Sequence, residues 1–69
     1  MKETIQVEVE YNEKKVTLTI EGDTREWEET WHVTSAVAED GTELDENIWS
    51  GTSNEMDKAF FAMVEYFNE

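Results

Sequence analysis

The chain has 69 residues, of which 18 are Asp or Glu and 5 are Lys or Arg, and its formal net charge is −13. This charge excludes nucleic acid and anionic membranes as direct partners, and it favours a protein that displays a basic groove. The length predicts a single domain over residues 1–69, and the absence of cysteine excludes disulfides and thiolate metal sites.

The first elements expected along the chain are two β-strands. Residues 4–11 and 16–21 alternate apolar and polar side chains, which is the pattern of strands with one buried face. The polar segment 12–15 separates them and predicts a turn. Closing this turn as a hairpin places Tyr11 opposite Val16.

A third strand is expected after the turn signal at Gly22-Asp23. Its predicted inner face carries Trp27, Trp31, Val33 and Val37. Glu29 and Ser35 interrupt this face, so we expect a β-bulge near one of them. A bulge exchanges the inside and the outside for the residues beyond it, so the direction of the later side chains depends on where it lies.

The next turn signal, Asp40-Gly41, is the strongest in the chain and predicts a fourth strand within residues 42–49. This segment has low β-propensity, and the spacing of Leu44 and Ile48 also suits a helical turn, so strand and turn are both open. The predicted hairpin sets Trp49 opposite His32 on the outer face. Alternatively, Trp49 turns inward through a bulge and completes the core.

The last element is a helix from residue 53 to about 68, with Thr52 and Glu55 spaced as a capping box. Its predicted inner stripe consists of Met56, Ala59, Phe60, Met63, Val64 and Phe67. The resulting fold class is α+β, a four-stranded antiparallel β-meander with one C-terminal α-helix packed on one face. An exposed edge strand leaves both a monomer and a homodimer open.

The acidic residues form two candidate partner-binding groups. Strand alternation is expected to direct the first group to the solvent face of the sheet, as a row made of Glu8, Glu10, Glu21, Glu26 and Glu28. The second group follows the third strand and consists of Glu39, Asp40, Glu43, Asp45 and Glu46. Such anions could replace the phosphates of a nucleic-acid strand on a basic surface. Alternatively, they serve solubility alone, although a net charge of magnitude about 2–8 suffices for that in a small domain.

Two aromatic residues are candidate contacts of another kind. Phe61 lies on the polar arc of the predicted helix, between Asp57 and Glu65, and together with Trp49 it could anchor a protein partner. Alternatively, Phe61 is a single exposed apolar side chain without a role. His32 has no nucleophile beside it, and Gly41 stands in the wrong place for a calcium loop, so we expect no enzyme activity, metal or cofactor.

In its size, acidity and lack of cysteine and of a catalytic constellation, the chain resembles the small acidic proteins by which bacteriophages inhibit host defence nucleases, the anti-CRISPR and anti-restriction inhibitors that include DNA mimics. The likeness covers overall character and no motif. It implies a stoichiometric inhibitor that occupies the basic channel of an effector nuclease in the bacterial cytoplasm. A cytoplasmic location also agrees with the absence of an apolar stretch long enough for a signal peptide.

Overall fold

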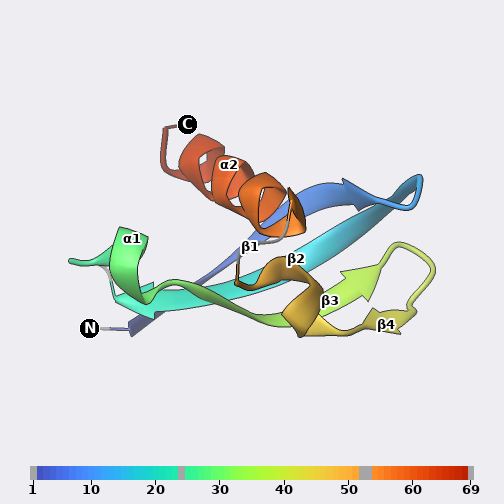
Figure 1. The fold of residues 1–69 in the computed structure, drawn as a ribbon, viewed down its shortest axis with the longest axis horizontal. Helices are drawn as coiled ribbons and strands as arrows, with labels where there is room; N and C mark the ends of the chain where they lie inside the picture. Colours follow the sequence, from blue (N-terminus) through green and yellow to red (C-terminus); the bar gives the residue numbers. More distant parts are fainter. Residues whose placement is uncertain (1, 24, 52–53, 69) are drawn as a thin grey trace.

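The computed structural model describes residues 2–23, 25–51 and 54–68, and it has an α+β fold in which a helix covers one face of an antiparallel sheet (Figure 1). In chain order the elements are β1 (Lys2–Tyr11), β2 (Lys14–Asp23), α1 (Trp27–Thr30), β3 (His32–Ala38), β4 (Glu43–Leu44), the 3-10 helix η1 (Glu46–Trp49) and α2 (Asn54–Asn68). The strands lie in the order β1-β2-β3-β4, and each neighbouring pair is antiparallel. The predicted meander with one C-terminal helix is therefore confirmed.

The β1–β2 hairpin closes through a tighter turn than the sequence predicts. Its loop is Asn12 and Glu13, which both have positive φ angles, 50° and 64°, as in a type I′ turn. Tyr11 therefore pairs with Lys14 and not with Val16. The register differs from the expected one by two residues, and this shift leaves every side chain on its predicted face.

The predicted bulge lies in β3 beside Ser35. Ile20 pairs with Val33, and Thr19 pairs with Ser35. Thr34 is therefore the extra residue of the bulge. Beyond this point the faces exchange, and Ala36 and Ala38 are buried on the helix side of the sheet. Val37 points to the outer face, contrary to the prediction that it lines the core.

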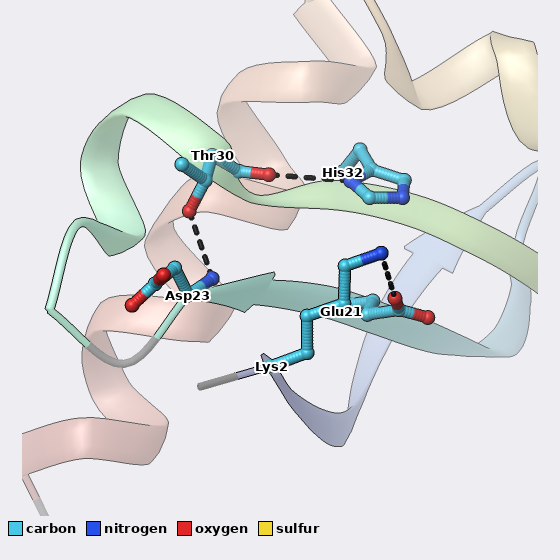
Figure 2. Close-up of polar contacts among 5 residues, drawn as sticks. All are labelled: Lys2, Glu21, Asp23, Thr30 and His32. Atoms are coloured by element: carbon cyan, nitrogen blue, oxygen red, sulfur yellow. Dashed lines mark hydrogen bonds and ion pairs between the residues drawn. The ribbon is translucent and has the colours of Figure 1, made fainter.

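The segment predicted to begin the third strand is instead the short helix α1. Its hydrogen bonds fix it to the end of β2, because the Asp23 N–H donates to Thr30 Oγ1 over 2.8 Å (Figure 2). Thr30 Oγ1 in turn donates to the Glu26 carbonyl over 2.7 Å. The Glu26 N–H also donates to the Asp23 carbonyl over 3.1 Å. These local bonds turn the chain before β3 begins. Trp27 was predicted to point inward, and its side chain lies outside the described part of the structure.

The fourth strand is short, and a helical turn follows it. Only Glu43 and Leu44 pair with β3, after which η1 begins with Asp45 as its N-cap. This helical turn brings Trp49 to the helix side of the sheet, where it is 1% exposed and its ring lies 5.3 Å from that of Tyr11. The pairing of Trp49 with His32 is therefore wrong, because His32 pairs with Glu21 and Trp49 belongs to the core.

The core lies between the sheet, η1 and α2. Its buried members are Ile5, Val7, Val9, Val16, Leu18, Ile20, Val33, Ala36, Ala38, Trp49, Ala59 and Met63. The predicted helix stripe is correct at Ala59 and Met63 but not at Val64 and Phe67, which are 37% and 45% exposed. The core between the sheet and the helix also contains Trp49 of η1. The helix α2 therefore packs mainly on β1 and η1. The proposed N-cap, Thr52, lies outside the described residues.

None of the helices in the described ranges has the length and apolar character that crossing a bilayer demands.

Candidate acidic interface

The five-acid row expected on the outer face is only partly present. Glu8, Glu10 and Glu21 belong to β1 and β2 and alternate with the buried residues of these strands, so they project from the outer face. Glu26 precedes α1 and Glu28 lies within it, so neither residue extends the row as a strand residue. The predicted placement of these two acids was wrong because the third strand begins later than expected.

The sheet register instead places two acids of the second group on the same rows of the outer face as acids of the first group. Glu43 pairs with Val37, whose partner Thr17 pairs with Glu8, so Glu8 and Glu43 end the same row across four strands. The Glu39 N–H donates to the Lys15 carbonyl over 2.9 Å, and Lys15 pairs with Glu10. We call these four exposed residues, Glu8, Glu10, Glu39 and Glu43, the acidic corner. It spans about 14 Å, since neighbouring strands lie roughly 4.8 Å apart.

Two other acids of the second group have structural roles. Asp40 accepts hydrogen bonds from the Thr42 N–H over 3.0 Å and from Lys14 Nζ over 3.1 Å, and these contacts hold the two hairpin tips together. Bonding to the Thr42 hydroxyl and N–H, with a smaller effect of Lys14, lowers the pKa of Asp40 to about 2. Asp45 Oδ1 accepts the Asn47 N–H over 2.9 Å and caps η1. Glu46 is exposed beside it.

The opposite end of the outer face combines acidic and basic side chains. There Lys2 Nζ lies 3.4 Å from Glu21 Oε1, and His32 Nδ1 lies 3.2 Å from the Thr30 carbonyl oxygen (Figure 2). A hydrogen bond from the Arg25 N–H is the main reason that the pKa of the Asp23 carboxyl is lowered. Acids therefore occur at both ends of the molecule, and the end that carries the hairpin tips differs in that its exposed acids lie on shared rows of the sheet register.

The aromatic candidates have opposite environments. Phe61 is 66% exposed, which agrees with its predicted position on the outer arc of the helix, and its ring contacts that of Phe60 at 6.1 Å. Trp49 is buried, so its ring is not available to a partner as the sequence hypothesis required. Glu65, which the sequence places beside Phe61 on the polar arc, is exposed one helical turn beyond it.

The described residues contain no group of three or more His, Asp or Glu side chains placed to hold a metal ion. A surface hollow of about 560 Å³ is lined by Trp31, His32 and Trp49 among others, but His32 bonds only to a backbone carbonyl there. The acidic corner is thus the principal polar feature that the fold assembles from separate segments.

Comparisons with protein-family models, with curated proteins and with solved structures found no match to this chain.

Proposed function

We propose that this chain is a non-enzymatic acidic inhibitor that binds the basic nucleic-acid-binding surface of a host defence protein or of another nucleic-acid-handling protein. In this role it acts in a bacterial cytoplasm and competes with DNA or RNA, in the manner of the phage anti-CRISPR or anti-restriction inhibitors that it resembles. The observation that carries the proposal is the acidic corner, where four exposed carboxylates from different segments lie on the face that also carries Lys15.

The physical argument concerns how proteins hold nucleic acid. They gain most of their affinity by neutralising phosphates with Lys and Arg, and these side chains stay available to any other polyanion of similar spacing. Within one strand, Glu8 and Glu10 are about 7 Å apart, since each residue rises roughly 3.3 Å. The net charge of −13 steers the whole molecule toward a basic groove and raises the association rate.

The test uses two variants that remove three negative charges each. One is Glu8→Gln, Glu10→Gln and Glu43→Gln in the acidic corner, and the matched control is Glu3→Gln, Glu26→Gln and Glu29→Gln at the other end of the molecule. Each protein is immobilised and exposed to bacterial lysate, and retained proteins are released with duplex DNA at constant ionic strength. We expect DNA to displace nucleic-acid-binding proteins from the parent and from the control, and the corner variant to retain far less.

Two results contradict this proposal. If duplex DNA releases nothing, the chain does not compete for a nucleic-acid-binding surface. If both triple variants lose retention equally, total charge is responsible and the acidic corner is not the interface.

A second candidate function is a protein-interaction module that binds through exposed aromatic residues, with charge for steering and solubility. The exposure of Phe61, Tyr66 and Phe67 on α2 favours this candidate. Salt separates the two functions, since exposed ion pairs are screened and desolvated aromatic contacts are not. Phe61→Ala abolishes binding in the second case and leaves salt-sensitive binding intact in the first.

A further inference from the structure

A groove runs along the free edge of the sheet, between β1 and α2. In the sheet formed by the described residues, β1 is an edge strand, and α2 packs against it. Two hollows, of about 460 and 350 Å³, lie between these elements. We call them together the β1 edge groove, which is lined by Gln6, Val7, Glu8, Val9 and Glu10 of β1 and by Lys58, Phe61, Ala62, Glu65 and Tyr66 of α2.

The backbone of β1 offers hydrogen-bonding groups to this groove. The Lys15 carbonyl accepts a bond from the Glu39 N–H, so the peptide groups of Lys15 point toward β3 and away from β1. Lys15 pairs with Glu10, and this pair is therefore a non-hydrogen-bonded one in which Glu10 directs its own N–H and C=O to the free edge. Alternation along the strand gives Gln6 and Glu8 the same direction.

The side chains along the groove differ between its two sides. On the outer face of the sheet, Glu8 and Glu10 are exposed acids next to the edge. On the helix side, Phe61 offers an exposed ring with Glu65 beside it. The basic side chain in the groove is Lys58, whose Nζ lies 3.5 Å from Glu55 Oε2. A strand placed along β1 would therefore meet acids on one of its faces and an aromatic ring on the other.

We infer that the β1 edge groove binds an extended segment of a partner protein as an added β-strand, in which Lys or Arg alternates with apolar residues. Cross-strand neighbours lie roughly 5 Å apart, so basic side chains would contact Glu8 and Glu10 while apolar ones cover Phe61. The inference rests on the proposed function for the basic character of the partner. It adds that the partner contributes an extended strand, and not only a charged surface.

Charge complementarity selects this occupant over a second copy of the chain. Two copies would each bring a net charge of −13 to the contact, and like charges across an interface are strongly unfavourable. A basic segment removes the repulsion among Glu8, Glu10 and Glu65 and satisfies the edge of β1.

The experiment measures binding of a synthetic fluorescent peptide, Lys-Val-Arg-Val-Lys-Val-Lys, to the full chain. The matched control peptide contains the same residues with the valines in one block, so its charge and composition are unchanged. Amide hydrogen exchange of the protein is followed with and without the peptide. We expect slower exchange at Gln6, Glu8 and Glu10, whose N–H groups face the edge, and little change at Val7 and Val9, which already pair with β2.

A variant of the chain tests the backbone contacts without altering charge. Gln6→Pro removes one outward N–H and blocks strand addition, and proline is tolerated where the N–H of an edge strand faces solvent. We expect peptide affinity to fall about tenfold, since one main-chain hydrogen bond is lost and the proline ring obstructs further pairing. Circular dichroism verifies that the variant keeps its fold.

Three results overturn the inference. The first is equal affinity for the alternating and the blocked peptide, and the second is binding without protection at Gln6, Glu8 and Glu10. The third is self-association of the chain that protects the same amides in the absence of peptide. Because no nucleic acid is present, any of these failures leaves the DNA displacement test of the acidic corner unaffected, and a failure of that test leaves peptide binding to be judged by itself.

Discussion

The two edges of the sheet are built differently. At one edge, β4 has only two residues, after which η1 turns the chain away and places Trp49 in the core. At the other edge, β1 runs for ten residues beside the groove that it forms with α2. Short edge strands resist pairing with other chains, whereas long ones invite it. The comparison shows one short edge followed by η1 and one long edge, and the long edge is the one at which we propose strand addition.

The largest effect is expected from Trp49→Ala, which removes the core side chain that η1 supplies after the β4 edge. Truncating a buried aromatic side chain costs about 3–5 kcal/mol, which is comparable to the whole stability of a domain this small. We expect urea denaturation, followed by circular dichroism, to find the variant largely unfolded in water.

Trp49→Phe is the matched control for this edge. The buried Nε1 of Trp49 has no hydrogen-bond partner among the described residues, so its removal offsets part of the lost packing. We expect the free energy of unfolding to fall by roughly 1–2 kcal/mol relative to the parent. If the Ala variant is as stable as the Phe variant, the ring of Trp49 does not anchor η1 in the core.

A proline pair tests the β1 edge. Val7→Pro removes an N–H that pairs with β2 and should cost about 3 kcal/mol or more, whereas Gln6→Pro removes an outward N–H and should cost within about 1 kcal/mol. Thermal melts of the two variants measure the difference. Equal losses would mean that the outward N–H groups of β1 are not free for an added strand.

Glu13→Gly sharpens the comparison at the tip of the β1–β2 hairpin. Glu13 has a φ of 64°, a conformation that costs a residue with a Cβ atom about 1–2 kcal/mol, and glycine after Asn12 is the preferred sequence for a type I′ turn. Once the entropy cost of glycine is subtracted, we expect the free energy of unfolding, measured with denaturant, to rise by about 0.5–1 kcal/mol. Gly41 already supplies a positive φ at the other tip, so Gly41→Ala should have the opposite sign.

The smallest effect concerns the contact that joins the two hairpin tips. The pKa of Asp40 is about 2 in the folded chain and 3.8 in the reference state, so the ionised form stabilises the fold above pH 4 and this contribution is lost as the pH falls toward 2. Asp40→Asn should lower the melting temperature slightly at neutral pH, with a difference from the parent that disappears near pH 2. A constant difference across this range would show that Asp40 acts through packing and not through its charge.

Local patterns in the sequence determined the fold class, the two faces of β1 and β2, the existence of α2 and the exposure of Phe61. These features follow from periods of 2 and 3.6 residues and from turn signals, which depend on near neighbours along the chain. The overall charge is likewise a property of composition.

The tertiary structure decided the remainder. The bulge at Thr34, the start of β3 after α1 and the burial of Trp49 depend on which strands meet and in what register. The same register places Glu43 on the row of Glu8 and sets Glu39 beside the partner of Glu10, whereas Glu26 and Glu28 lie outside the paired strands. A shift of one residue between strands reverses every side chain beyond it, and packing across the sheet fixes that shift, so no local pattern could have located the acidic corner.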